Sequence, residues 1–340
     1  MIRIELAAIG RIGRDLQGCE GVMVARDGTI WAADGRGACT RIAADGSREE
    51  RVGDLGGQPN GICLDAEGRI IVANIAAGSV QRLDPTTGRH DVLATHASAR
   101  PTTTPNFPFM DRQARLWVSS STSRAHFMDA VHEPAGDGFL FRLAGGRAEV
   151  VADELWFANG VAIDAGEHHV YVAESMKARV TRFPIRAGGS LGAREQYGPN
   201  LGMEFAPDGI AFDEAGNLWV VCPGAHALGV ITPGGAWEIA VRDPAGSVLN
   251  LPTNICFGGP DRRTAYIGNL PGPSLPTFRV PHAGMALVHQ LRARGLRLRR
   301  PIPSIDGVGS LRGRSGFDGG EKARAACRGS CSPRNPSRAA

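Results

Sequence analysis

Short apolar stretches with a period of two recur along residues 1–290, and turn residues separate them. In one unit, residues 209–212, 217–221, 228–232 and 237–241 are mostly apolar or alternating, with Gly, Asp, Asn or Pro between them. This pattern predicts four short strands joined by tight turns. No stretch favours a helix of more than two turns. The sequence therefore predicts an all-β protein.

The four-strand unit repeats six times. Each repeat begins with a polar residue, followed by an apolar run, an Asp-Gly-like turn and a second apolar run. The opening residues, spaced 40 to 53 positions apart, are Glu20, Asn60, Asn106, Asn159, Asp208 and Asn254. Repeats of this length with several short strands each are typical of β-propellers. We therefore expect a six-bladed β-propeller with four antiparallel strands per blade, closed by residues 2–12 pairing with the last blade.

The composition changes after about residue 290. Residues 291–340 are rich in Arg, Gly, Ser and Pro without periodicity, which predicts a largely disordered tail behind a propeller domain of residues 1–290. The tail contains 12 of the 38 Lys and Arg residues but only 3 of the 34 Asp and Glu residues. The propeller is therefore acidic although the chain has a formal charge of +4. A basic face for nucleic acid is not expected.

The seven cysteines are odd in number and irregularly spaced. They fit free thiols in a reducing compartment better than a disulfide framework or a zinc site. No run of about 18 apolar residues predicts a membrane helix, and the N-terminal residues are typical of a strand rather than a signal peptide. We therefore expect a cytoplasmic protein without a membrane partner.

The repeat geometry brings the six opening residues to one level of the channel. The first strand of each propeller blade lines the central channel, so these residues should surround the axis. All six have a side-chain oxygen, and Glu20 and Asp208 are carboxylates. Two nearby carboxylates repel each other and raise one pKa unless a cation balances them. Oxygen ligands without His or Cys favour one Ca²⁺, with Mg²⁺ and Mn²⁺ as alternatives and Zn²⁺ disfavoured.

These motifs resemble the family of senescence marker protein, gluconolactonase and luciferin-regenerating enzyme over roughly residues 15–290. The residues that carry the resemblance are Glu20-Gly21, Pro59-Asn60-Gly61, Pro105-Asn106, Phe157-Ala158-Asn159-Gly160 and Pro207-Asp208-Gly209. The resemblance implies a metal-dependent hydrolase that opens a lactone or related ester, or a phosphotriester as in diisopropyl fluorophosphatase. It also implies that Glu20, Asn159 and Asp208 bind the metal and that Asn106 contacts substrate or metal.

The third repeat departs from the sugar-lactone members of that family. Phe107 stands where they can have Asp, and Thr104 stands where they can have Arg, which disfavours an aldonolactone. The loop 119–138 and the connection that contains Trp156 carry large apolar side chains at the same end of the channel. They predict either a cover for the core or an apolar substrate pocket. The predicted substrate contacts are Asn60, Asn106, Phe107 and Trp156.

The expected reaction is metal-assisted hydrolysis of a small-molecule lactone or ester. The cation would polarise the carbonyl, and Asp208 would act as general base or as nucleophile. The sequence contains no Gly-x-Ser-x-Gly elbow and no phosphate-binding glycine loop. His226, on a neighbouring connection, is expected to be structural. The alternatives are a non-catalytic interaction module with a structural metal and a strictosidine synthase-like enzyme. The sequence leaves the oligomeric state open.

Overall fold

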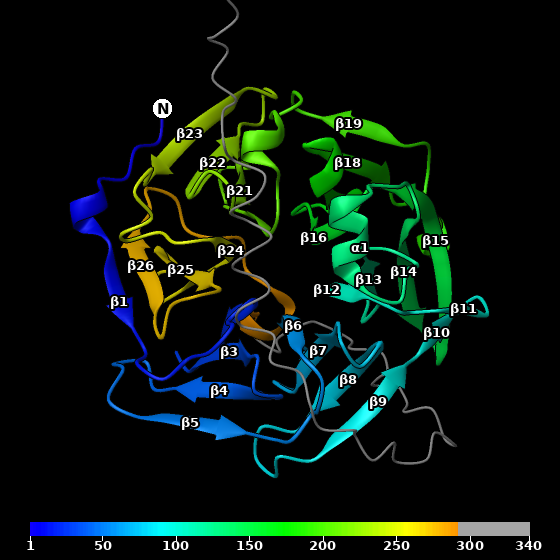
Figure 1. Cartoon of the computed structure of the whole chain (residues 1–340), viewed down its shortest axis with the longest axis horizontal. Coiled ribbons are helices and arrows are strands. Elements are labelled where there is room, and N and C mark those ends of the chain that lie inside the picture. The colour runs from blue at the N-terminus through cyan, green and yellow to red at the C-terminus, as the bar shows by residue number, and fades with distance from the viewer. Residues whose placement is uncertain (292–340) are drawn as a thin grey trace, which may run out of the picture. The chain divides into compact units, whose positions relative to one another are not determined.

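The computed structural model describes residues 1–291, which form six four-stranded antiparallel sheets around a central axis (Figure 1). This confirms the six-bladed β-propeller. The predicted tail lies outside the described residues apart from Leu291. No helix in the described part of the chain is long and apolar enough to cross a membrane. The five cysteines of this part are free and buried.

Five blades take their strands from consecutive segments. Blade one contains β2 (Val22–Val24), β3 (Ile30–Asp34), β4 (Ala38–Ile42) and β5 (Glu49–Val52). Blade two contains β6 (Pro59–Leu64), β7 (Ile70–Asn74), β8 (Ser79–Leu83) and β9 (His90–Ala94). Blade three contains β12 (Pro105–Met110), β13 (Leu116–Ser120), β14 (Gly138–Ala144) and β15 (Arg147–Leu155). Blade four contains β16 (Ala158–Ile163), β17 (His169–Glu174), β18 (Arg179–Pro184) and β19 (Glu195–Tyr197). Blade five contains β20 (Ile210–Phe212), β21 (Leu218–Cys222), β22 (Ala227–Ile231) and β23 (Trp237–Arg242).

Blade six joins the two ends of the propeller. It contains β24 (Pro252–Gly258), β25 (Thr264–Asn269), β26 (Leu275–Arg279) and the N-terminal β1 (Gly10–Ile12). Gly10 lies opposite Thr277 and Ile12 opposite Leu275 in an antiparallel ladder. The predicted closure of the ring is therefore confirmed, and the ring leaves no blade without its outer strand.

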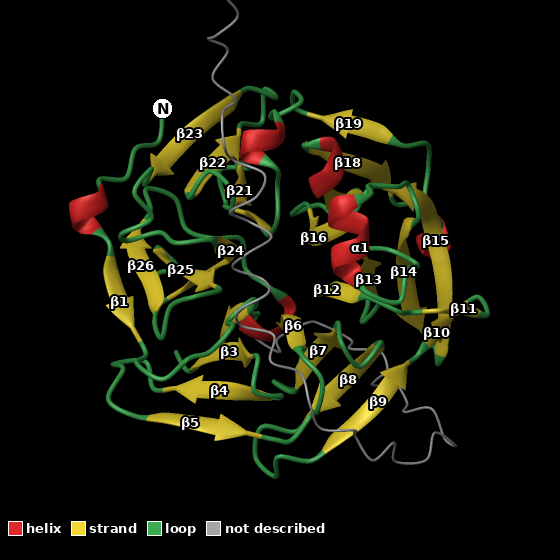
Figure 2. Ribbon diagram, in the orientation of Figure 1, coloured by secondary structure: helices red, strands yellow, loops and turns green. Residues whose placement is uncertain are grey.

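The remaining elements are short (Figure 2). A two-stranded ribbon pairs β10 (His96–Ala97) with β11 (Arg100–Pro101). The loop between β13 and β14 contains α1 (Phe127–His132). The 3-10 turns are η1 (Leu6–Ala8), η2 (Ser175–Lys177), η3 (Ala187–Gly189), η4 (Met203–Phe205) and η5 (Val288–Gln290). The expectation of no helix longer than two turns holds for the described residues.

An aspartate anchors the first hairpin of several blades. Asp111 Oδ1 accepts the backbone N–H groups of Gln113 and Arg115, and its Oδ2 accepts the Trp117 indole N–H at 2.8 Å. Blade five repeats the arrangement, with Asp213 accepting the indole N–H of Trp219 at 3.1 Å. The aspartate thus shapes the turn and satisfies a buried tryptophan. This explains why Asp recurs at this place in the sequence repeat.

A bulge interrupts the first strand of four blades at the level of the opening residue. In blade two, Pro59 pairs with Asn74 and Ile62 pairs with Val72, so the two residues between Pro59 and Ile62 have no ladder partner. The pairs left out of the ladders in blades two, three, four and six are Asn60-Gly61, Asn106-Phe107, Asn159-Gly160 and Thr253-Asn254. A bulge bends the strand and redirects its side chains.

This register corrects the prediction for the sixth blade. Thr253 occupies the position that Asn60 occupies in blade two, and Asn254 occupies the position of Gly61. Asn254 was therefore assigned wrongly as the opening residue, by one position. The polar pattern is misleading because both Thr and Asn are common at the start of a strand. Only the pairing of the strands shows that Thr253-Asn254 is equivalent to Asn60-Gly61.

The residues after the opening residues form a second level, called here the glycine layer: Gly21, Gly61, Phe107, Gly160, Gly209 and Asn254. A Cβ added to Gly160 would lie 2.5 Å from the Asp208 carbonyl oxygen, and one on Gly21 would lie 2.6 Å from that of Asn60. The glycines therefore let the first strands of neighbouring blades approach each other closely. Phe107 and Asn254 are the exceptions, in blades three and six.

We expect Gly160→Ala to destabilise the propeller, because the new Cβ would overlap the Asp208 carbonyl. Overpacking of this kind costs roughly 1–3 kcal/mol, measurable by denaturant unfolding. Gly234→Ala is the matched control, since the nearest atom to its added Cβ is Thr232 Oγ1 at 3.8 Å. Its stability should stay within about 0.5 kcal/mol of the original. Equal stabilities of both variants would contradict the close-approach argument.

Candidate functional site

The opening residues of neighbouring blades contact one another around the channel. They are called here the ring: Glu20, Asn60, Asn106, Asn159, Asp208 and Thr253. Asn60 Nδ2 donates to the Asn106 carbonyl at 3.4 Å, and Thr253 Oγ1 donates to the Glu20 carbonyl at 2.9 Å. The Asn159 amide hydrogen bonds to the Asp208 carboxylate, whose pKa also responds to the charge of Glu20. The structure therefore brings the three predicted metal ligands together, with the predicted contacts Asn60 and Asn106 at the same level.

The two carboxyl groups of this ring are held in an environment that disfavours their charge. Both side chains are partly buried. Burial raises the pKa of Glu20 to about 7, and the nearby Thr253 hydroxyl group opposes this rise. Burial, and next the charge of Glu20, raise the pKa of Asp208 well above its ordinary value, against the hydrogen bond from Asn159. A positive charge between the two carboxylates would relieve both effects.

Serine hydroxyl groups fix the amides of the ring asparagines. Asn106 Nδ2 donates to Ser121 Oγ at 3.0 Å, and Asn106 Oδ1 is buried without a partner among the described residues. Asn159 Nδ2 lies 3.3 Å from Ser175 Oγ, which itself donates to the Pro207 carbonyl at 2.7 Å. These contacts occupy the amide nitrogens and leave the Asn106 oxygen available as an acceptor or ligand.

The donor set fits a hard divalent cation. It combines two carboxylates with carboxamide oxygens, including the unpartnered Oδ1 of Asn106. No three His, Cys, Asp or Glu side chains gather at one point within residues 1–291, so amide ligands would have to complete the coordination shell. Oxygen ligands of this kind suit Ca²⁺ or Mg²⁺. The residues that would hold the cation are Glu20, Asn159 and Asp208.

Two polar residues outside the ring have structural roles. Glu174 is fully buried, pairs with Arg179 at 2.8 Å and accepts the backbone N–H of Trp156 at 2.9 Å. It therefore fixes the connection that leads into β16 and Asn159. His226 Nδ1 accepts the backbone N–H of Leu251 at 3.0 Å, which is the structural role expected for it.

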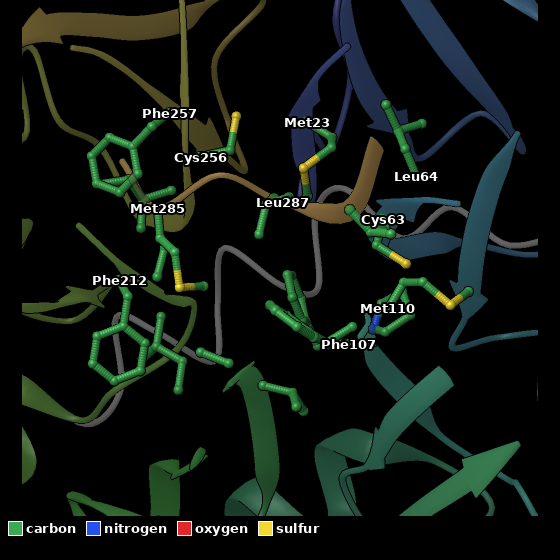
Figure 3. Close-up of a pocket in the computed structure, with 18 of the residues that line it drawn as sticks. Met23, Cys63, Leu64, Phe107, Met110, Phe212, Cys256, Phe257, Met285 and Leu287 are labelled. Atoms are coloured by element: carbon green, nitrogen blue, oxygen red, sulfur yellow. The ribbon is translucent and has the colours of Figure 1, made fainter. Parts of the chain in front are cut away.

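The predicted apolar contacts Phe107 and Trp156 lie in different surroundings. Phe107, in the glycine layer, borders an apolar pocket inside the channel (Figure 3). The pocket is lined largely by the first strands beyond the ring and includes Met23, Cys63, Met110, Phe212, Phe257 and Met285. Trp156 does not line this pocket; it is half-buried between β15 and β16, with Lys177 Nζ 3.7 Å from its ring centroid.

Residues after the last blade contribute to the far end of the pocket. Met285 donates its backbone N–H to the Phe212 carbonyl at 2.9 Å, and a ring nitrogen of His289 lies 2.9 Å from the Val24 carbonyl. Burial lowers the pKa of His289 to about 4, so this imidazole is neutral at neutral pH. The repeat pattern did not predict a role for this segment, because the segment lacks the repeat. Its apolar residues and His289, which follow directly on the last repeat, are the features of the sequence that could have indicated that it packs on the propeller.

Comparison with known proteins gives a consistent picture. Residues 85–269 match the family model described as "SMP-30/Gluconolactonase/LRE-like region". A 6-deoxy-6-sulfogluconolactonase from Pseudomonas putida is 32% identical over 127 residues, which cover 36% of this chain and 40% of that enzyme. A pentonolactonase from Haloferax volcanii is 26% identical over 238 residues, or 59% of this chain and 77% of that enzyme. The match to the Pseudomonas enzyme thus spans less than half of its length.

A solved structure shares the fold. The calcium-binding protein regucalcin from Agrobacterium tumefaciens superimposes with a TM-score of 0.66 at 16% identity, covering 86% of this chain and 97% of that protein. At this identity the likeness establishes the propeller architecture alone.

We expect added Ca²⁺ to raise the thermal midpoint of the protein more at pH 8 than at pH 5. The folded-state pKa values of Glu20 and Asp208 are raised, so the folded protein without metal loses stability as the pH rises through about 7. The cation restores it only when the carboxylates are ionised. Calorimetric scans after EDTA treatment test this. Asp208→Asn is the control, in which the Ca²⁺-dependent rise should shrink at pH 8; an equal rise at both pH values would contradict the site.

Proposed function

The chain belongs to the SMP-30/gluconolactonase/LRE-like family, and we propose that it is a metal-dependent hydrolase that opens a lactone or a related ester. The observation that carries the proposal is the meeting of Glu20 and Asp208 with Asn159 at one level of the channel. The names of the two curated relatives, both lactonases, support the reaction class. The fold alone would not support a reaction class, because β-propellers occur in proteins with many different functions.

The proposed cofactor is one divalent cation held by Glu20, Asn159 and Asp208. We place Ca²⁺ first, with Mg²⁺ and Mn²⁺ as alternatives, because the donors are oxygens. The description of regucalcin as calcium-binding supports this choice. When bound, such a cation polarises a substrate carbonyl and stabilises the negative charge that develops on its oxygen.

Asp208 is the proposed catalytic residue. As general base it would take a proton from the attacking water and return it to the alkoxide that leaves the acyl carbon, which yields a hydroxy acid from a lactone. The alternative is direct attack by the carboxylate on the acyl carbon. A single turnover in H₂¹⁸O tests the nucleophile: ¹⁸O in the Asp208 carboxyl group would identify direct attack followed by opening of the anhydride at the aspartyl carbon, because a general base never takes water oxygen into its own carboxyl group.

The proposed substrate has an apolar body. Asn60 would contact the substrate at the level of the ring. The unpartnered Asn106 oxygen accepts hydrogen bonds, so it would bind the cation or a hydroxyl group, such as that of the hydroxy acid product. Phe107 would contact an alkyl or aryl group, because it borders the apolar pocket. Trp156 would contribute from the connection beside Asn159. The predicted cytoplasmic location stays a prediction.

We expect Asp208→Asn to lower kcat by roughly 10²- to 10⁴-fold, because an amide cannot accept the proton. Asn106→Ala should lie between this variant and the original protein. Stopped assays with dihydrocoumarin in saturating Ca²⁺ measure the effect, and circular dichroism verifies folding. Full activity of Asp208→Asn would exclude Asp208 as base or nucleophile and make Glu20 the next candidate.

We also expect kcat/KM for dihydrocoumarin to exceed that for D-glucono-1,5-lactone. An apolar wall discriminates by about 1–3 kcal/mol per methylene, whereas a polyhydroxylated substrate needs dedicated hydrogen bonds. Phe107→Ala should reduce the ratio of the two values roughly 10-fold or more. If gluconolactone is the better substrate, the apolar-substrate proposal is wrong, although the hydrolase proposal stands.

Chelation separates the hydrolase from the interaction module. Loss of hydrolysis after EDTA treatment and its return with Ca²⁺ support the proposed metal role. Hydrolysis that survives complete metal removal would contradict that role. A panel of lactones, aryl esters and diisopropyl fluorophosphate that yields no hydrolysis with Ca²⁺, Mg²⁺ or Mn²⁺ would leave the non-catalytic module as the better explanation.

A further inference from the structure

Asn254 is the polar exception in the glycine layer. Four of the six positions of this layer are glycine, and the fifth is Phe107. The ladder of blade six shows that Asn254 belongs to the layer and that Thr253 is the ring residue. Most blades have no side chain at this level. Of the two side chains in the layer, those of Phe107 and Asn254, only that of Asn254 can form hydrogen bonds.

The contact between blades five and six places Asn254 against Gly209, the residue that follows Asp208. Gly209 donates its backbone N–H to the Thr253 carbonyl at 2.7 Å. A Cβ added to Gly209 would lie 2.7 Å from Asn254 Cα and 3.1 Å from Asn254 Cγ. The carboxamide of Asn254 thus packs against the residue that follows Asp208, and the missing side chain of Gly209 leaves room for it.

The carboxamide oxygen of Asn254 has no protein partner. Asn254 is 3% exposed, and its Oδ1 is buried without a hydrogen bond in the described part of the chain. Leaving a buried acceptor unpaired costs about 1–3 kcal/mol, so such groups usually have a partner that is not protein. Asn106 Oδ1 is unpartnered in the same way, but it lies in the ring of opening residues, where it is available to the proposed cation. A small O–H donor beside Asp208 would satisfy the Asn254 oxygen.

We infer that Asn254 positions the water that attacks the substrate. This inference rests on the proposed hydrolase. The water donates one O–H to Asn254 Oδ1 and the other to Asp208, which leaves a lone pair of its oxygen directed at the acyl carbon. As the new C–O bond forms, Asp208 takes the proton, and the bond to the ring oxygen of the lactone breaks. The proton passes to the departing alkoxide, so the sum is lactone plus water giving hydroxy acid.

The chemistry of the amide suits this position. A carboxylate there would add a third negative charge near Glu20 and Asp208, where the charge of Glu20 already disfavours the ionised form of Asp208. A neutral carboxamide accepts the hydrogen bond without that repulsion. A second O–H acceptor holds the water in one orientation, and loss of such orientation costs up to about 10²-fold in rate.

The decisive variant is Asn254→Gly, because glycine is the residue of the same layer in blades one, two, four and five. We expect kcat for dihydrocoumarin to fall roughly 10- to 100-fold, with KM changed less than about 3-fold. Ca²⁺ affinity, measured by titration calorimetry, should be unchanged. Asn254→Ser places an acceptor hydroxyl on the same backbone and should recover part of kcat.

Asn217→Gly is the matched control for loss of a buried asparagine. Asn217 lies at the first hairpin turn of blade five, where its Nδ2 donates to Asp213 Oδ2 at 2.9 Å. This variant should lower the thermal midpoint and leave kcat unchanged.

The outcomes are distinguishable. If Asn254→Gly keeps the kcat of the original protein, or loses only thermal stability as Asn217→Gly does, the water-positioning role is wrong while the hydrolase stands. A rise in KM confined to hydroxylated lactones would also overturn it, because the oxygen would then bind substrate. If the original protein hydrolyses no ester or lactone, the proposed function and this inference fail together.

Discussion

The close approach of the six first strands around the channel is the constraint on which the rest of the structure depends. Backbone atoms of one strand lie where a side chain of its neighbour would be, as the 2.5 Å between an added Gly160 Cβ and the Asp208 carbonyl shows. Glycine therefore occupies most of the layer directly beside the ring. Bulges at the same level bend the first strands of blades two, three, four and six and redirect their opening residues. The polar ring and the glycine layer are consequences of one packing requirement.

The same requirement concentrates charge. Because neighbouring strands are so close, Glu20 and Asp208 lie near each other in partly buried positions, and burial raises the pKa of both. Two carboxylates that burial holds close together are unfavourable when both are ionised, and for the same reason they would attract the proposed cation. Stability and the proposed chemistry are thus coupled through two side chains. The buried oxygens of Asn106 and Asn254, which have no partner among the described residues, likewise cost stability in the protein without a ligand.

Phe107 and Asn254, the two residues of the glycine layer that are not glycine, make this part of the channel differ from a regular repeat. Phe107 brings an aromatic face to the pocket below the ring, and Asn254 places a neutral carboxamide against Gly209, the residue after Asp208. Segments outside the repeat shape the two ends: the connection with Trp156 is fixed by Glu174, and Met285 and His289 pack at the far end of the pocket. In this protein the repeat supplies the framework, and the departures from the repeat are the residues to which we assign the proposed specificity.

The sequence by itself determined the propeller, its closure by the N-terminal strand, and five of the six ring residues, because strand periodicity and the repeat of Asp-containing turns are local properties that each blade expresses alike. It also placed Glu20, Asn159 and Asp208 among six residues around the axis, since equivalent positions of a closed ring meet there. The resemblance to the family, and not the geometry, singled out these three. Only the tertiary structure decided that Thr253 and not Asn254 opens blade six, that Asn254 and Phe107 occupy glycine positions, and that Phe107 and Trp156 lie in different surroundings. These facts depend on ladder register and on contacts between blades, which involve residues far apart in the chain.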